Sequence, residues 1–253
     1  MSQISHSETV ARQFGDQAAA YLNSSVHAQG AEFAELAAVV AARPGAKVLD
    51  LGCGAGHVSF HAAEAGGKVT AYDLSRQMLD VVAAEAGRRG LDIATRQGAV
   101  ESLPFADGEF DFVFSRYSAH HWGDVPQALR EARRVLRLDG ALAMIDIASP
   151  GVPLLDTHLQ AVEVLRDTSH VRNYAAAEWL AMLAAAGFRL ERAERRKLRL
   201  EFSSWVERMR TPPEMREAIR ALQRAMGREV RDYFDIDGDG SFSSDMLALW
   251  ARP

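Results

Sequence analysis

The stretch Val48-Leu49-Asp50-Leu51-Gly52-Cys53-Gly54-Ala55-Gly56 decides the fold of this 253-residue chain. An apolar strand runs into a glycine-rich turn, where the absence of a Cβ atom lets a ligand lie directly against the backbone. Such a turn alone indicates a tight strand-to-helix connection or a nucleotide-like ligand. A dinucleotide fingerprint counted from Gly52 needs a third glycine where His57 stands, and counted from Gly54 it needs one at Ser59, so both registers fail.

Two carboxylates lie at the ends of the first two predicted strands. Asp50, beside the turn, would repel a pyrophosphate and attract the ammonium group of a methionine moiety that carries no phosphate. Asp73 follows 23 residues later, where a carboxylate can accept hydrogen bonds from both ribose hydroxyls. The local alternative is that each carboxylate caps the next helix. Their spacing matches one βα unit, and together they favour a sulfonium nucleoside over a dinucleotide.

Short β-rich runs alternate with helical stretches between residues 45 and 150, a pattern typical of a doubly wound α/β fold with a mostly parallel sheet. No internal repeat or long linker is present, so we expect a single domain. It should consist of a helical N-terminal cap (1–44), a core that binds the cofactor (45–150), and a C-terminal part (151–253) whose helices, together with the last two strands, lie on the side of the second substrate, the acceptor. The predicted strands are 47–51, 68–73, 92–98, 110–115, 141–147, one within 188–202, and 241–251. The predicted helices are 10–23, 31–42, 75–89, 125–136, 175–186 and much of 203–232.

Composition excludes several classes of protein. With 48% apolar and 25% charged residues, the chain has the composition of a folded domain. The net charge of -5 argues against a general electrostatic grip on nucleic acid. The absence of a long apolar stretch or basic leader predicts no membrane span and a cytoplasmic protein. The single cysteine, Cys53, cannot form an intramolecular disulfide, and we expect no metal site. The oligomeric state stays open.

Four ordered blocks resemble the class I S-adenosylmethionine-dependent methyltransferases, within the type 11 branch similar to the ubiquinone and menaquinone C-methyltransferases. The blocks are residues 48–56, Tyr72-Asp73-Leu74-Ser75, Glu101-Ser102-Leu103-Pro104-Phe105 followed by Phe110-Asp111-Phe112-Val113, and Arg134-Val135-Leu136-Arg137-Leu138-Asp139-Gly140. The resemblance implies a Rossmann-like seven-stranded sheet, parallel except for the last strand, with helices on both faces. It also implies S-adenosylmethionine as the methyl donor, with S-adenosylhomocysteine as the product.

Two residues or runs depart from the family pattern. Ala99 stands where many relatives have an acidic residue that accepts a hydrogen bond from the adenine amino group. The run Leu138-Asp139-Gly140 replaces the usual Pro-Gly-Gly, and we interpret it as a turn variant without effect on chemistry.

The resemblance also assigns the cofactor site residue by residue. The methionine end would lie on the turn and its strand (Asp50, Gly52, Cys53, Gly54), and the ribose would bind Asp73. The adenine would lie between Leu74 and Met78 on one side and Ala99, Val100 and Glu101 on the other. The sulfonium would lie above Ser115 and Arg116. Tyr21, on a helix that folds over the cofactor in the family, would bind the methionine carboxylate. Tyr21 and Phe14 share one face of that helix, and packing in the core explains them equally well.

Methyl transfer is an in-line displacement on a carbon activated by positive sulfur, so alignment is the main task and a base is needed only for a protonated acceptor. The candidate acid/base groups are Tyr117, His120 and His121, which follow the fourth strand, where this fold presents acceptor-side groups. Hydrogen bonding within the loop or packing on Trp122 is the alternative. Because adjacent side chains point different ways, at most one histidine should face the methyl group. The charged run 166–172 indicates an acceptor pocket or a solvated helix face.

A second motif competes with this interpretation. Residues 235–243 fit the first nine positions of a calcium-binding EF-hand loop. Met246, however, stands where the bidentate glutamate of position twelve is needed, and a turn between two antiparallel strands explains the same residues. The sequence therefore predicts a methyltransferase acting on a small-molecule acceptor. The alternatives are a non-catalytic or regulatory S-adenosylmethionine-binding protein on the same fold and a calcium-binding protein through 235–246.

Overall fold

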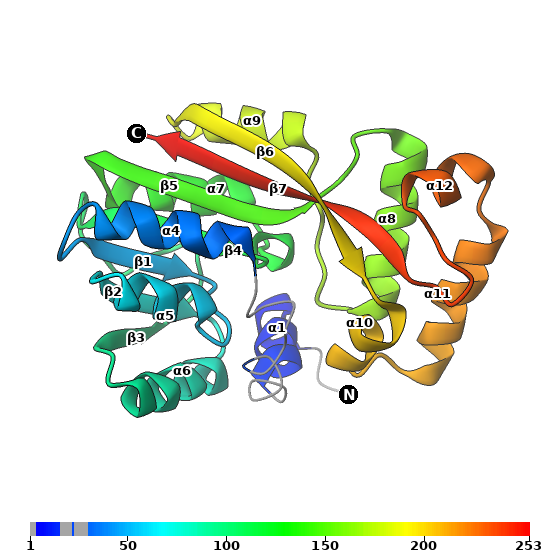
Figure 1. The fold of residues 1–253 in the computed structure, drawn as a ribbon, viewed down its shortest axis with the longest axis horizontal. Coiled ribbons are helices and arrows are strands. Elements are labelled where there is room, and N and C mark those ends of the chain that lie inside the picture. The colour runs from blue at the N-terminus through cyan, green and yellow to red at the C-terminus, as the bar shows by residue number, and fades with distance from the viewer. Residues whose placement is uncertain (1–3, 16–21, 23–29) are drawn as a thin grey trace.

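The computed structural model describes residues 4–15, 22 and 30–253. One seven-stranded sheet has the order β3-β2-β1-β4-β5-β7-β6, and helices cover both of its faces (Figure 1). β7 pairs antiparallel with β5 and β6, whereas the other pairings are parallel, so the predicted sheet is confirmed. The strands are β1 (Lys47–Leu51), β2 (Lys68–Asp73), β3 (Ile93–Gln97), β4 (Phe110–Arg116), β5 (Leu136–Ala148), β6 (Arg189–Leu200) and β7 (Phe242–Arg252).

The helices of the described residues fall into three groups. Helices α4, α5 and α6 pack on one face of the sheet, and helices α7 and α9 pack on the other face. The remaining helices lie near the ends of β6 and β7, except α1, which lies beside α6. None of them is both long and apolar enough to cross a lipid bilayer. Their bounds are α1 (His6–Gly15), α4 (Ala31–Ala41), α5 (His57–Glu64), α6 (Arg76–Arg89), α7 (Val125–Val135), α8 (Pro153–Arg166), α9 (Ala176–Ala185), α10 (Phe202–Arg208), α11 (Pro213–Ala225) and α12 (Arg228–Tyr233).

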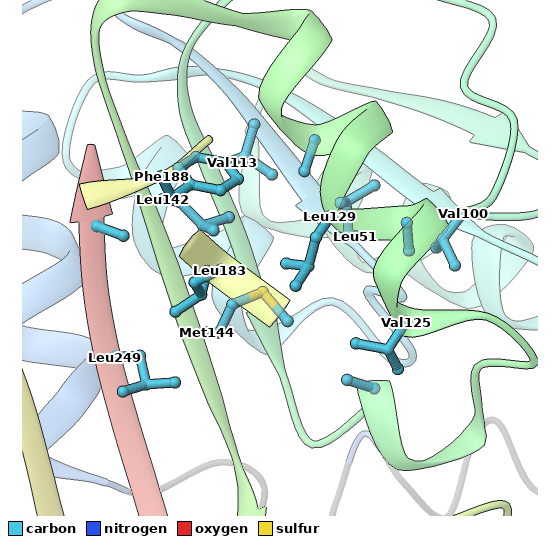
Figure 2. Close-up of a cluster of buried hydrophobic side chains, with 14 of the residues drawn as sticks. Leu51, Val100, Val113, Val125, Leu129, Leu142, Met144, Leu183, Phe188 and Leu249 are labelled. Carbon is cyan, nitrogen blue, oxygen red and sulfur yellow. The ribbon is translucent and has the colours of Figure 1, made fainter. Parts of the chain in front are cut away.

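Successive residues of the central strands build two separate cores, because side chains alternate between the faces of a sheet. Val113 of β4 belongs to the core that also holds Leu129 of α7 and Leu183 of α9 (Figure 2). Its neighbour Phe112 belongs to the opposite core, with Leu36 of α4. A strand that is buried on both faces consists of consecutive apolar residues, and the positions of these strands could therefore be predicted from the sequence.

A third core lies where β6 and β7 extend past the rest of the sheet, next to α8, α10, α11 and α12 (Figure 1). Trp205 of α10 packs edge-on against Phe242 of β7, with ring centroids 4.9 Å apart. In the β6–β7 register, Leu200 is paired with Phe242. The segment 201–241 therefore leaves the sheet and returns to it at one place.

The prediction was wrong for residues 136–140. α7 ends at Val135 and β5 begins at Leu136, so Leu138-Asp139-Gly140 lies in a strand and is not a turn. Leu136 pairs with Phe110 of β4, and the register of the two strands shifts between Phe110 and Phe112. The next pair after Leu136 is Ala141 with Phe112, so residues 137–140 form an irregularity in the strand, a local disruption of the ladder typical of a β-bulge.

The first helix begins at His6, four residues before its predicted start. Ser5 Oγ accepts a hydrogen bond from the Glu8 amide at 3.2 Å, and the Glu8 carboxylate accepts one from the Ser5 amide at 2.6 Å. This reciprocal pair is a capping box, a signal that is visible in the sequence. The end of the predicted helix, including Tyr21, lies outside the described residues.

Candidate functional site

The glycine-rich turn after β1 lines a cavity of about 280 Å³, called the first cavity below. Gly52 and Gly54 have φ angles of +64° and +51°, a backbone conformation that favours glycine. A Cβ atom on Gly54 would meet no atom within 4 Å, so this glycine keeps space open beside the cavity. A Cβ atom on Gly52 would instead lie 1.8 Å from Ser118 Oγ. Gly52 therefore makes room for the loop after β4, a reason that the sequence did not reveal.

The first cavity gathers side chains from the carboxyl ends of neighbouring parallel strands, as expected for this class of sheet. Ser115 does not line it: the side chain is buried, and its hydroxyl has no hydrogen-bond partner. His120 lines a neighbouring cavity instead. The predicted residues that do line the first cavity are Asp50, Gly52, Cys53, Gly54, Asp73, Leu74, Met78, Ala99, Val100, Glu101, Arg116, Tyr117 and His121.

Asp50 is 1% exposed, and its Oδ2 atom accepts a hydrogen bond from Ser59 Oγ at 2.6 Å. Burial raises the pKa of Asp50 to about 7, against the lowering effect of the Ser59 hydrogen bond, and the nearby charge of Asp73 raises it further. The N-cap of α5 is Gly56, so Asp50 is not the capping residue. A buried carboxyl with this pKa favours a positively charged ligand, which would stabilise its ionised form.

Asp73 is held by backbone amides at the edge of the first cavity. Its Oδ2 atom accepts a hydrogen bond from Gly54 N at 2.9 Å, and its Oδ1 atom accepts one from Ser75 N at 2.8 Å. Burial raises the pKa of Asp73, although these amides oppose the shift. The N-cap of α6 is Ser75, which accepts from Met78 N, so Asp73 does not cap the helix. Each carboxylate oxygen keeps a second lone pair for a ligand hydroxyl.

A second cavity of about 60 Å³ adjoins the first. Phe14, Tyr117 and His121 line both cavities. The second cavity also has walls from α8 and α10, which contribute Glu163 and Trp205. Sequence reasoning did not single out these two residues, because only the folding of the C-terminal segment brings them to the site.

The charged run 166–172 divides between a cavity and local ion pairs. Arg166 and Asp167 line the second cavity. Arg172 instead pairs with Asp156 at 3.2 Å and with Glu178 at 3.3 Å. The acceptor pocket stays a prediction, and the solvated helix face was wrong for Arg172, which lies after the end of α8.

His120 and Asp146 form a close pair between the loop after β4 and the interior of β5. His120 Nδ1 lies 2.6 Å from Asp146 Oδ1, and Asp146 Oδ2 accepts a hydrogen bond from the His120 amide at 3.2 Å. Burial lowers the pKa of His120, but the charge and hydrogen bond of Asp146 outweigh it, so that the pKa is raised. Asp146 was missed, although a lone carboxylate within a buried apolar strand was a usable signal.

His121 has different partners from His120. Its Nδ1 atom donates to the Ser169 carbonyl oxygen at 3.0 Å, and its Nε2 atom lies 3.9 Å from Asp167 Oδ2. The ring meets that of Phe14 edge-on, with centroids 4.8 Å apart. Burial lowers the pKa of His121, and the neighbouring charge of His120 lowers it further. His121 is therefore a weak base held in place by its neighbours.

Arg116 forms a buried ion pair with Glu32, and the ring of Tyr117 packs against its guanidinium. The Arg116 guanidinium is 2.8 Å from Glu32 Oε1, and both side chains are almost fully buried. The same guanidinium stacks on the rings of Tyr117 and Phe33 at 4.3 and 4.4 Å. Burial raises the pKa of Tyr117 to about 12, so its hydroxyl stays protonated at neutral pH.

The EF-hand-like run forms a turn between α12 and β7, so the expected turn between two antiparallel strands was wrong. Arg199 contacts the carboxylates of Asp235 and Asp237, and Asp239 accepts a hydrogen bond from the Ser241 amide at 2.9 Å. Within residues 4–15, 22 and 30–253, no cluster of three or more His, Cys, Asp or Glu side chains is arranged to hold a metal ion.

Comparisons with known proteins agree with this geometry. Residues 49–144 match a family model described as a methyltransferase domain. The chain is 54% identical over 198 residues to the uncharacterized protein YafE of Escherichia coli (strain K12), covering 78% of this chain and 96% of YafE. It is 35% identical over 178 residues to a malonyl-[acyl-carrier protein] O-methyltransferase of Pseudescherichia vulneris, covering 70% and 67% of the two chains.

The protein YcgJ of Bacillus subtilis (strain 168), described as an uncharacterized methyltransferase, is similar in sequence and in structure. The two sequences are 33% identical over 224 residues, which cover 88% of each chain. The crystal structure of YcgJ superposes with a TM-score of 0.81 over 87% of this chain and 98% of YcgJ. The chain therefore belongs to the S-adenosylmethionine-dependent methyltransferases of class I.

Proposed function

We propose that this chain binds S-adenosylmethionine in the first cavity and transfers its methyl group to a small-molecule acceptor. One observation carries the proposal: the buried carboxyl of Asp50 and the half-buried carboxyl of Asp73 lie at the ends of adjacent strands, and Gly54 keeps the space beside them open. Bound S-adenosylmethionine supplies a methyl carbon that is activated by a positively charged sulfur. The residues of the chain bind and orient it.

The charges of the first cavity suit a sulfonium nucleoside. The carboxylates of Asp50, Asp73 and Glu101 line this cavity, and the Arg116 guanidinium is paired with buried Glu32. A ligand with phosphate groups would be repelled by this arrangement, whereas an ammonium group and a sulfonium would be attracted. This balance of charge favours the methyl donor over a nucleotide.

Each end of the cofactor has a matching group. Asp50 would hold the ammonium of the methionine end, and Asp73 would accept hydrogen bonds from the ribose hydroxyls. The adenine would lie between Leu74 and Met78 on one side and the segment 99–101 on the other. Glu101 Oε1 accepts hydrogen bonds from the amides of residues 123 and 124 at 3.1 and 3.3 Å, which anchors that wall of the cavity. Tyr21 stays a proposed ligand of the methionine carboxylate.

Calorimetric titration with S-adenosylhomocysteine tests the cofactor assignment. We expect the wild type to bind, and Asp73→Asn to bind at least about tenfold more weakly, because hydrogen bonds to a charged group contribute roughly 1.5–3 kcal/mol each. Asp80→Asn is the matched control, since Asp80 is an exposed carboxylate on α6 that pairs with Arg76. Absence of binding, or equal affinities for the wild type and Asp73→Asn, would contradict the assignment.

Release of S-adenosylhomocysteine from S-adenosylmethionine in the presence of small acceptors tests the catalytic part. A panel of phenols, amines, thiols and carboxylates covers the common nucleophiles. We expect turnover with at least one of these classes. A protein that binds S-adenosylhomocysteine tightly but turns over with none of them would favour the non-catalytic alternative.

A further inference from the structure

The second cavity holds the only pair of its kind among the described residues: a histidine that shares a short hydrogen bond with a buried carboxylate and also faces a cavity. We propose that His120, oriented by Asp146, is the general base of the reaction and that the acceptor is a neutral hydroxyl compound, a phenol or an enol. This inference rests on the methyl transfer proposed above. It adds the class of acceptor and a positioning residue, Asp146.

The hydrogen bond with Asp146 fixes the tautomer of His120. A carboxylate can only accept, so the 2.6 Å contact requires a proton on His120 Nδ1 and leaves the lone pair on Nε2. Within the described part of the chain, no hydrogen bond to His120 Nε2 is present. His120 lines the second cavity, which shares Phe14, Tyr117 and His121 with the first. The base therefore lies in the cavity that adjoins the proposed donor site.

Neither of the other two candidates suits the same role. His121 donates its Nδ1 proton to the Ser169 carbonyl oxygen, and burial lowers its pKa, which weakens it as a base. Tyr117 keeps its proton at neutral pH, because burial raises its pKa to about 12. His120 alone of the three combines a basic nitrogen with a raised pKa.

The groups around His120 set its charge. The carboxylates of Asp146, Glu163 and Asp167 all stabilise a protonated His120, and the Arg166 guanidinium is itself paired with Glu163 at 3.3 Å. An imidazolium formed during the reaction is thus favoured by its surroundings. The titratable and charged groups that face His120 or its cavity are Asp146 on β5, Tyr117 after β4, His121 beside it, Glu163 and Arg166 on α8, Asp167 and His170 after α8, and Arg208 on α10.

The charges also select the class of acceptor. A carboxylate acceptor needs no base, and Glu163 and Asp167 in the cavity wall would repel it. An ammonium acceptor would be repelled by the positive sulfur of the donor. A neutral hydroxyl meets neither penalty, and the anion that forms as it loses its proton is attracted to the donor. Asp167 Oδ2 is buried without a hydrogen-bond partner, so a donating group on the ligand would satisfy it.

The chemical step balances with these groups. The acceptor oxygen forms a bond to the methyl carbon as the carbon–sulfur bond breaks, and the electron pair of that bond stays on sulfur. The hydroxyl proton moves to His120 Nε2, and Asp146 stabilises the resulting imidazolium. The proton leaves to solvent after the product departs.

Nitrogen NMR of ¹⁵N-histidine-labelled protein, saturated with S-adenosylhomocysteine, tests the positioning role without turnover. At pH 8 we expect His120 to carry its proton on Nδ1 and none on Nε2. In Asp146→Asn, the amide favours the opposite tautomer, so the proton should move to Nε2. A wild-type His120 with its proton on Nε2 would overturn the proposal.

Kinetics with phenol and catechol, compared with benzoate and benzylamine, test the base and the acceptor class. We expect transfer to hydroxyl compounds only, with kcat lowered about 10²–10⁴-fold in His120→Gln and KM little changed. The wild-type kcat should rise with pH as His120 loses its proton, and this limb should disappear in His120→Gln. His61→Gln is the matched control, a histidine on α5 outside both cavities.

Calorimetry with S-adenosylhomocysteine keeps the two proposals separate. If the wild type does not bind it, the proposed function fails. If the wild type, His120→Gln and Asp146→Asn all bind it within about threefold, the donor site is intact, and the kinetics then decide. A kcat of His120→Gln within threefold of the wild type overturns the base, and a wild type that methylates none of the hydroxyl probes overturns the acceptor class.

Discussion

The Oγ atom of Ser118 lies 1.8 Å from the place that a Cβ atom would take on Gly52. Ser118 is itself held there, because its hydroxyl accepts a hydrogen bond from Trp122 Nε1 at 3.0 Å. The turn after β1 and the loop after β4 are thus in direct contact. His120 lies on that same loop, so the contact of Ser118 with Gly52 ties the loop of the proposed base to the turn that lines the first cavity.

Three alanine substitutions separate the roles of the glycines. Gly45 has a φ angle of +75° and open space around it, so Gly45→Ala should show only the backbone penalty, about 1–2 kcal/mol of unfolding free energy. Gly54→Ala should lose a similar amount and also bind S-adenosylhomocysteine at least about tenfold more weakly. Gly52→Ala should be the least stable because of Ser118. Urea unfolding and calorimetry measure both effects, and equal affinities of Gly45→Ala and Gly54→Ala would contradict the assignment.

Binding of S-adenosylhomocysteine should weaken as the pH falls below about 7. Burial raises the pKa of Asp50 to about 7 in the ligand-free protein, and only its ionised form attracts the ligand ammonium. Each pH unit below that value should therefore weaken binding roughly tenfold, and binding should release a proton. Calorimetry in buffers of different ionisation enthalpy measures this proton. Asp50→Asn should bind weakly and without this pH dependence; an unchanged profile in this variant would point to another group.

The same carboxyl should lower the stability of the ligand-free protein at alkaline pH. Between about pH 4 and pH 7 the unfolded chain ionises Asp50 while the native state keeps it protonated, so stability falls as the pH rises. Asp50→Asn lacks this loss. Its Tm should exceed that of the wild type at pH 8, and the difference should shrink toward zero near pH 4. A difference that grows toward acid pH would reverse the sign and exclude Asp50 as its source.

Removal of one partner of the Glu32–Arg116 pair should destabilise the protein strongly. Glu32→Gln leaves a buried guanidinium without its counter-charge, which costs roughly 3–5 kcal/mol. The double variant Glu32→Gln with Arg116→Met removes both charges and should recover part of that loss. Urea unfolding of the four proteins of the cycle measures the coupling. A double variant whose loss of stability equals the sum of the losses of the two single variants would show that the pair is not coupled.

The cofactor half of the candidate site was predictable because its residues are local to strand ends. Asp50 and Asp73 each end an apolar strand, and parallel strands bring their carboxyl ends to one edge of the sheet. The pairing of β1 with β2 therefore follows from the βα pattern alone. The alternative that these two carboxylates cap the following helices was wrong, because Gly56 and Ser75 occupy the N-cap positions of α5 and α6.

The acceptor side depends on contacts that no local pattern contains. Asp146 meets His120 only because β5 lies next to β4 in the sheet. Trp205 reaches the second cavity only because the segment after β6 folds back beside α8. Likewise, the strand start at Leu136 depends on pairing with Phe110 across the sheet. Long-range pairing, not propensity, decides these three features.

The register that pairs Leu200 with Phe242 gives residues 201–241 adjacent entry and exit points on the sheet. This segment supplies Trp205 to the second cavity and nothing to the first. A stretch joined in this way can be exchanged as a cassette between related chains without breaking the strands that border the first cavity. Diversification of acceptors, by evolution or by grafting, has a ready place in this architecture.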